Sequence, residues 1–180
     1  MENFTDVKYI LDGFLFVFSG ILVMWMAAGF AMLEAGLTRT KNNVTVLTKN
    51  IALFAISCIM FYFVGYNFMY GEGSAFIGSG AMLSGKSSED LGYPLMADFF
   101  FQVVFVATAA SVISGTIAER MKLWPFLIFV VVLSGVIYPI QGHWSWGGSE
   151  LGGLMAGFSD FAGSTIVHSV GEIGRASCRE

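Results

Sequence analysis

Cysteine and histidine, which most metal sites and many catalytic sites need, are scarce in this chain. There are two cysteines, Cys58 in an apolar run and Cys178 in a polar tail, and two histidines, His143 and His168. Two thiols so far apart indicate neither a disulfide framework nor a metal-binding cluster. The sequence also has no phosphate-binding glycine motif and no basic patch for nucleic acid. We therefore expect no metal, no cofactor and no nucleic-acid partner, and we do not expect an enzyme.

Charge is scarce as well. Charged residues make up 12% of the chain, whereas soluble domains have about 25%. Hydrophobic residues make up 56% and aromatic residues 16%, and the mean hydropathy is +0.71. A soluble domain of this length has too little interior to bury so much apolar surface. The composition therefore excludes an ordinary soluble protein and predicts a membrane protein.

Four uncharged stretches are close to the length of about 20 residues that a helix needs to cross a bilayer. They cover residues 13–33, 51–70, 99–118 and 123–140, and a partial fifth covers 161–171. Pro125 lies near the start of the fourth, where a missing N–H costs least, and we expect Pro139 to mark its end. The fold class predicted is therefore all-α, a polytopic transmembrane helix bundle.

The basic residues predict an orientation. Five of them lie in two connections between spans and two on the other side: Arg39, Lys41, Lys49, Arg120 and Lys122 against Lys8 and Lys86. Because cytoplasmic loops are enriched in lysine and arginine, the five should be cytoplasmic. The N-terminus is then extracellular or periplasmic.

Two aromatic motifs are candidate sites. Phe101 and Phe105 are four residues apart and share a helix face, where their rings could plug a pore or could simply pack. The segment His143-Trp144-Ser145-Trp146 follows the fourth span. Tryptophan is common at membrane interfaces, but an indole face also attracts a cation by about 0.5–2 kcal/mol.

The segment from Asp160 to His168 is the third candidate. If a helix begins near Asp160, eight residues at 1.5 Å each bring His168 about 12 Å deeper, close to the midplane of a ~30 Å core. Asp160 would cap that helix, and its charge would also favour cations. An ionisable group inside a membrane usually marks an ion or substrate pathway. The alternative for His168 is a neutral side chain bonded to a neighbouring helix.

Six blocks, in order along the chain, carry a family resemblance. They cover residues 29–36, 49–50, 98–105, 114–120, 146–148 and 160–168. In these blocks the chain resembles the ammonium transporter (Amt/Mep/Rh) family, and more closely its Amt branch. The resemblance implies an outer ammonium site formed by Trp146 and Phe101 and shaped by Asp160. It also implies that Phe105 is a gate and that His168 is the first of two pore histidines.

The same resemblance implies the mechanism and the partners. Ammonium or methylammonium would be recruited at the outer cation–π site, and NH3 would pass along a histidine-lined pore. The protein would be a homotrimer in the plasma membrane, and a PII-type regulator would act through a C-terminal tail outside this sequence.

Residues 172–180 depart from the family pattern, because they carry four charged residues where an apolar helix should continue. We expect residues 1–171 to be the N-terminal part of an Amt-type inverted-repeat channel and the polar tail to be an artefact. Such a truncated first half should conduct nothing alone. The alternative function is a non-conducting membrane sensor or assembly subunit. The small-residue face at 111–115 suits close helix packing in either case.

Overall fold

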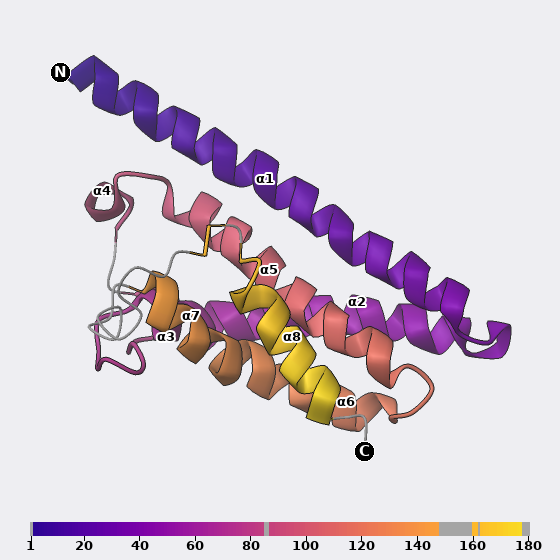
Figure 1. Ribbon diagram of the computed structural model, residues 1–180. Coiled ribbons are helices and arrows are strands. Elements are labelled where there is room, and N and C mark those ends of the chain that lie inside the picture. Colours follow the sequence, from indigo (N-terminus) through magenta and orange to yellow (C-terminus); the bar gives the residue numbers. More distant parts are fainter. Residues whose placement is uncertain (1, 85–86, 148–159, 162, 178–180) are drawn as a thin grey trace.

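The structure, a computed structural model, describes residues 2–84, 87–147, 160–161 and 163–177. The elements, in order, are α1 (Glu2–Leu37), the 3-10 turn η1 (Thr40–Asn42), α2 (Asn43–Met60), the π-helical turn η2 (Phe61–Gly65), α3 (Tyr66–Tyr70), α4 (Ser88–Leu91), α5 (Leu95–Ile117), α6 (Leu123–Val132), the π-helical turn η3 (Leu133–Ile137), α7 (Tyr138–Trp146) and α8 (Ile166–Ser177). Figure 1 shows them as a bundle of helices. The predicted all-α class is confirmed.

Among the described residues, four continuous helical runs are long and apolar enough to cross a membrane. They cover Asp6–Leu37, Thr40–Tyr70, Leu95–Ile117 and Leu123–Trp146. Each corresponds to one of the four spans predicted from the sequence, although the first, second and fourth extend well beyond the uncharged cores. The chain is therefore a membrane protein with a polytopic helix bundle.

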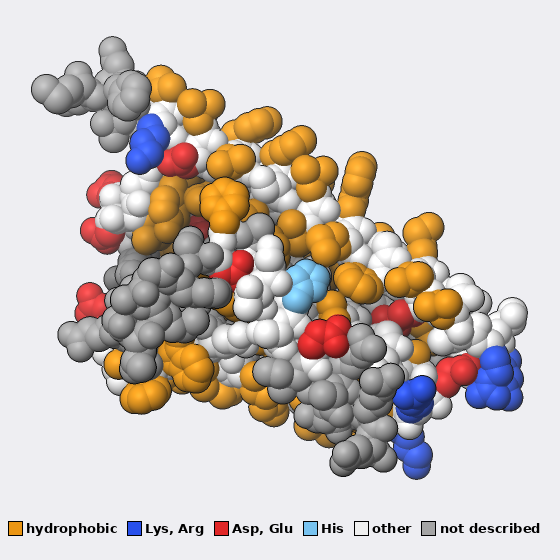
Figure 2. All heavy atoms as spheres, in the orientation of Figure 1, with side chains coloured by type: hydrophobic (Ala, Val, Ile, Leu, Met, Phe, Trp, Pro, Cys, Tyr) orange, Lys and Arg blue, Asp and Glu red, His pale blue; other side chains and the backbone are white. Residues whose placement is uncertain are grey.

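Helix α1 lies along one side of the bundle and packs mainly on α5 (Figure 1). Only 6% of its most apolar window is buried, against 56% for α5. Large apolar side chains such as Phe14 and Trp25 are exposed on it, and Figure 2 shows apolar side chains protruding along this helix. Because such a surface is unfavourable in water, we assign it to contact with lipid or with another subunit.

Helix α5 is the centre of the bundle and packs against α1, α2 and α8. Its middle is a run of small residues that are almost completely buried, Ala107, Thr108, Ala109, Ala110 and Ser111. Small residues let neighbouring backbones approach closely, which drives helix association in a membrane. The buried hydroxyls of Thr108 and Ser111 bond to carbonyl oxygens one turn earlier in α5, at 2.8 Å and 3.0 Å.

The fourth span does not end at Pro139, and that prediction is wrong. The helix runs on as α7 to Trp146, after the π-helical turn η3. Proline removes one backbone hydrogen bond and its ring collides with the carbonyl four residues earlier. That carbonyl belongs to Gly135, inside η3. The wider π turn accommodates the proline ring without ending the helix.

The two π turns face each other. A Cβ atom added to Gly65 in η2 would lie 2.7 Å from the carbonyl oxygen of Ser134 in η3. Gly135 lies equally close to the second run, because an added Cβ would lie 3.2 Å from Cε of Met60. The absence of side chains at these two glycines lets the second and fourth helical runs meet at this level.

His143 is buried in α7 and ties α7 to the connection that follows α3. Its Nδ1 lies 2.7 Å from the carbonyl oxygen of Met69, and its Nε2 lies 3.1 Å from that of Ser74. The sequence predicted that His143 follows the fourth span, whereas it lies within the helical run Leu123–Trp146 and only 3% of the residue is exposed. Its role here is structural.

Candidate functional site

Trp146 and Asp160 meet at one end of the bundle, which we call the Trp146 end. The indole Nε1 of Trp146 donates a hydrogen bond of 3.0 Å to the main-chain oxygen of Asp160. This bond joins the last turn of α7 to the segment that leads into α8. One ring edge of Trp146 lies close to Gly163, since an added Cβ there would be 3.4 Å from the ring.

The carboxylate of Asp160 caps α8 from a distance. Its Oδ2 accepts hydrogen bonds from the backbone N–H groups of Thr165 and Ile166, at 3.0 Å and 2.7 Å. A helix start near Asp160 was predicted, and this is wrong, because α8 begins at Ile166 and Gly163 has a φ of +71°. The depth of about 12 Å calculated for His168 no longer applies. His168 instead lies in the first turn of α8.

Replacing Asp160 should loosen the start of α8. In a full-length protein, Asp160→Ala removes an acceptor for two otherwise unpaired N–H groups, and we expect a loss of about 1–2 kcal/mol in the free energy of unfolding. Amide hydrogen exchange at Thr165 and Ile166 should accelerate.

Asp90→Ala is the matched control, because Asp90 forms a capping box with Ser87 in the exposed helix α4. It should leave exchange in α8 unchanged. Unchanged exchange at Ile166 in Asp160→Ala would contradict the capping role.

Phe101 and Phe105 contact each other on α5. Their ring centroids are 5.1 Å apart with the planes at 82°, an edge-to-face arrangement. The ring of Phe16 from α1 lies 5.4 Å from that of Phe101. The predicted shared face therefore exists. Within the described residues, no ring contact joins this pair to Trp146.

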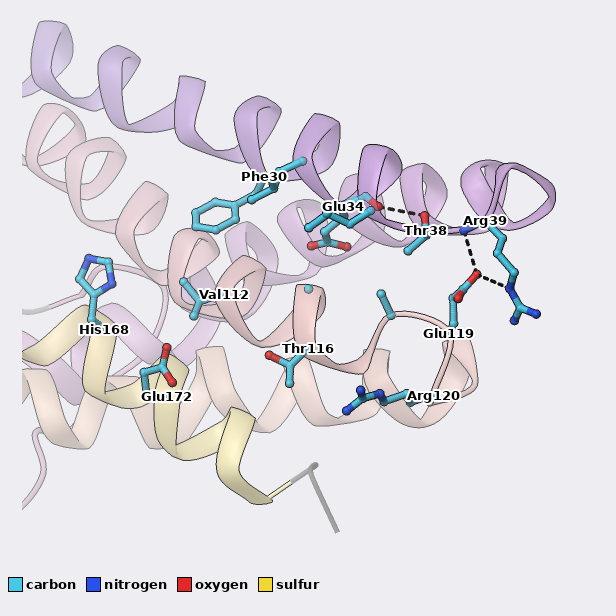
Figure 3. Close-up of a pocket in the computed structure, with 14 residues that line it drawn as sticks. Phe30, Glu34, Thr38, Arg39, Val112, Thr116, Glu119, Arg120, His168 and Glu172 are labelled. Carbon is cyan, nitrogen blue, oxygen red and sulfur yellow. Dashed lines mark hydrogen bonds and ion pairs between the residues drawn. The ribbon is translucent and has the colours of Figure 1, made fainter.

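His168 points into a cavity of about 840 Å³ between α1, α5 and α8. Phe30 and Glu34 of α1, Val112 and Thr116 of α5, and Glu172 of α8 also line it (Figure 3). The imidazole is exposed toward this space. Helices α5 and α8 are in close contact beside it, because a Cβ added to Gly171 would lie 2.9 Å from Val112. The alternative of a histidine bonded to a neighbouring helix finds no support among the hydrogen bonds of the described residues.

A buried ion pair that the sequence did not predict lies beside the cavity. Lys49 Nζ is 3.0 Å from Glu34 Oε2, and the two side chains are 8% and 3% exposed. The same oxygen accepts hydrogen bonds from Asn50 at 3.1 Å and from the hydroxyl of Ser114 at 3.0 Å. Lys49 also donates to the Ser114 carbonyl at 2.8 Å and lies over the ring of Phe126.

Sequence reasoning counted Lys49 among the loop charges, and this is wrong, because it lies inside α2. The position of Lys49 relative to the buried residues of α2 could have indicated that it is buried. Val46, Leu53 and Ser57 are buried positions of α2 at intervals of about one or two helical turns, and Lys49 and Asn50 fall on the same stripe. A lysine on a buried stripe requires an acidic partner.

Glu119 joins two connections between helices at the opposite end, which we call the Arg39 end. Its Oε1 accepts hydrogen bonds from Asn42 Nδ2 and, at 3.1 Å each, from the backbone N–H and the Nε of Arg39. These bonds hold Glu119 at a φ of +65°, a conformation that only a few residues other than glycine adopt. The hydrogen bonds from Asn42 and Arg39 lower the pKa of the Glu119 carboxylate below its ordinary value.

This pKa shift predicts a pH dependence. The group has a pKa of 4.5 when unperturbed and a lower one when folded, so its contribution to stability is present above about pH 4.5 and is lost as the pH falls through the folded pKa. The unfolding midpoint of Glu119→Gln should lie below that of the unmodified protein at pH 6. The difference should shrink below about pH 4.5. A difference that stays constant down to pH 3 would contradict this assignment.

The Ammonium Transporter Family model matches residues 14–174. Among curated relatives, a putative ammonium transporter of Synechocystis is 41% identical over 173 residues, which cover 94% of this chain and 39% of that protein. Ammonium transporter Amt2 of Archaeoglobus fulgidus is 45% identical over 163 residues, which cover 84% of this chain and 34% of that protein. The chain thus spans about two fifths or less of the length of these relatives.

Solved structures of Amt and Mep proteins have a fold similar to that of this chain. A structure described as a sensor Amt protein is 34% identical, covers 95% of this chain and 43% of its own, and has a TM-score of 0.83. Mep2 of Candida albicans has a TM-score of 0.72 at 24% identity and covers 87% of this chain and 35% of its own. The second likeness concerns the fold alone.

Proposed function

This chain belongs to the ammonium transporter family, and we propose that it forms the first part of a membrane path for ammonium and ammonia. The observation that carries the proposal is the position of His168. It lies at the start of a helix packed on α5, and it faces a cavity between that helix and the candidate membrane helices α1 and α5. An ionisable side chain in that setting is characteristic of a substrate pathway.

Trp146, Phe101 and Asp160 are proposed to form the recruitment site at the Trp146 end. An indole face attracts a cation by about 0.5–2 kcal/mol, and Asp160 fixes the indole through its main-chain oxygen. Phe105, one turn along α5 from Phe101, would gate the path.

Selectivity follows from the chemistry of the two cations. Ammonium and potassium have similar size and the same charge, but only ammonium donates hydrogen bonds and can lose a proton. The uncharged ammonia then passes His168, whose neutral imidazole offers one donor and one acceptor. A potassium ion can neither donate a hydrogen bond to the imidazole nor lose its charge, so the cost of removing its water is not compensated.

Orientation and assembly complete the proposal. The basic residues Arg39, Arg120 and Lys122 put the Arg39 end in the cytoplasm and the N-terminus outside. We assign the protein to the plasma membrane as a homotrimer. The exposed apolar face of α1 is consistent with a contact between α1 and lipid or another subunit. A PII-type regulator would act on the C-terminal tail of the full-length protein, and the full-length protein would carry out transport without enzymatic chemistry.

A sensor is the second candidate, supported by the likeness to the structure described as a sensor Amt protein. A sensor must bind ammonium and change conformation, but it need not conduct.

Uptake of labelled methylammonium distinguishes the two. A full-length protein containing this segment, expressed in transporter-deficient cells, should give saturable uptake. The 180-residue segment alone should give none. Absence of uptake by a membrane-inserted full-length protein, together with a substrate-dependent conformational signal, would favour the sensor.

A further inference from the structure

Among the residues that the structure describes, one oxygen of the Glu34 carboxylate has no hydrogen-bond partner. Its Oε2 is bonded to Lys49, Asn50 and Ser114, whereas its Oε1 is buried without a hydrogen-bond partner. Buried polar atoms almost always have a partner, and an orphaned one indicates a bound water or ligand or a functional role. The unpartnered oxygen belongs to a side chain that is 97% buried.

A cavity lies next to the Glu34 side chain, whose Oε1 is itself closed to solvent. Glu34 is part of the wall of the cavity that His168 faces (Figure 3). Gly115 of α5 lies opposite, and a Cβ added there would be 3.8 Å from Oε1 and 3.6 Å from Cγ. That is ordinary contact distance, so a small side chain at position 115 would occupy the space next to the oxygen.

The charges around the cavity suit a cation that donates hydrogen bonds. Lys49 contacts Glu34 at Oε2, at 3.0 Å, and is not among the residues that line this cavity. Arg39, at the rim, is bonded to Glu119. Besides Glu34, the lining includes the acidic residues Glu119 and Glu172 and the basic residues Arg39 and Arg120. A hydrogen bond from an ionised donor to a carboxylate is about twice as strong as a neutral one.

From this arrangement we propose that Glu34 Oε1 binds an ammonium ion at the Arg39 end of the path, as a second cation site distinct from the one at Trp146. The proposal deepens the transport function given above and rests on it for the identity of the ligand. Ammonium or methylammonium would donate an N–H to Oε1. Potassium and tetramethylammonium carry the same charge but have no N–H to donate.

The first test measures binding without requiring flux. In a full-length protein with Trp146→Leu, which removes the other site, ammonium chloride should raise the unfolding midpoint more than potassium or tetramethylammonium chloride at equal concentration, because a ligand of the folded state stabilises it. The double variant Glu34→Gln/Lys49→Met removes both charges of the pair together, so no charge is left uncompensated. It should abolish the excess rise. A persistent excess would overturn the proposal.

Gly115→Val provides an independent variant, because it fills the space beside Oε1 and leaves the ion pair intact. It should also abolish the ammonium-specific rise. Thr108→Val is the control on the same helix, since the Thr108 hydroxyl bonds only within α5. It should retain the rise. Retention of the ammonium-specific rise in Gly115→Val would show that the cation binds at a site other than Oε1 and would overturn the proposal.

The second test uses flux and separates this proposal from the transport function. In proteoliposomes with intact Trp146, the half-saturating concentration of methylammonium applied from the Arg39 side should rise roughly tenfold in Gly115→Val. The value from the Trp146 side should stay the same. If the half-saturating concentration in Gly115→Val does not differ between the two sides, the Glu34 site is overturned and transport remains established. Ammonium-specific stabilisation without any flux would establish the site and overturn the transport function.

Discussion

A full-length transporter carrying His168→Ala should lose most of its methylammonium uptake. In the proposed path the imidazole would offer a donor and an acceptor to ammonia inside the membrane, and His168 faces the cavity. An uncompensated polar solute in such a place costs about 1–3 kcal/mol, which is roughly a 5- to 150-fold fall in rate. Uptake measured at substrate concentrations above and below half-saturation gives the rate and the affinity separately.

His168→Gln is the matched variant, because glutamine keeps one donor and one acceptor in similar reach. It should retain more uptake than His168→Ala. The Ala variant also lacks the side chain that discriminates ammonia from an ion, so potassium should compete more strongly with methylammonium. Unchanged uptake and unchanged selectivity in the Ala variant would exclude a relay role for His168.

Lys49→Met should cause the largest loss of stability among single substitutions in the ion-pair network. Within the described part of the chain, the substitution leaves the buried Glu34 carboxylate with Asn50 and Ser114 as its partners. Removing one member of a buried ion pair typically costs about 3–5 kcal/mol, because the remaining charge stays uncompensated. Unfolding of the full-length protein by denaturing detergent should report this loss.

Two comparisons make the result specific. Glu34→Gln/Lys49→Met removes both charges and should recover most of the lost stability, since a neutral pair has little desolvation cost. Lys41→Met changes an exposed lysine in η1 and should shift the free energy of unfolding by less than about 0.5 kcal/mol. If the single and double variants are equally unstable, then the ion pair contributes through packing and not through its charge.

The membrane spans could be predicted from sequence because a bilayer imposes a simple requirement on length and polarity. Four uncharged stretches near 20 residues met it, and four helical runs contain them. The pairing of Phe101 with Phe105 was also predictable, because residues four apart meet on any α-helix. Both inferences depend only on local geometry.

Other features depend on contacts between segments distant in sequence. Pro139 ends a helix in isolation, but here the π turn before it keeps the helix continuous. Asp160 was predicted to start a helix, yet its side chain reaches N–H groups five and six residues later. Lys49 was predicted to be a loop charge, because its partner Glu34 comes from α1 and the sequence does not show that the two residues meet. The roles proposed for Trp146, Phe105 and His168 in transport stay predictions until the variants are measured.

The paired π turns also constrain how the length of this chain can change. Each π turn holds one more residue than an α turn, and deleting that residue would rotate the rest of its helix by about 100°. A deletion in Phe61–Gly65 would turn Tyr66 away from Asp98, to which it now bonds at 2.6 Å. A deletion in Leu133–Ile137 would likewise turn His143 away from Met69. Insertions and deletions inside these two helices should therefore be poorly tolerated, because the contacts that follow each π turn depend on its extra residue.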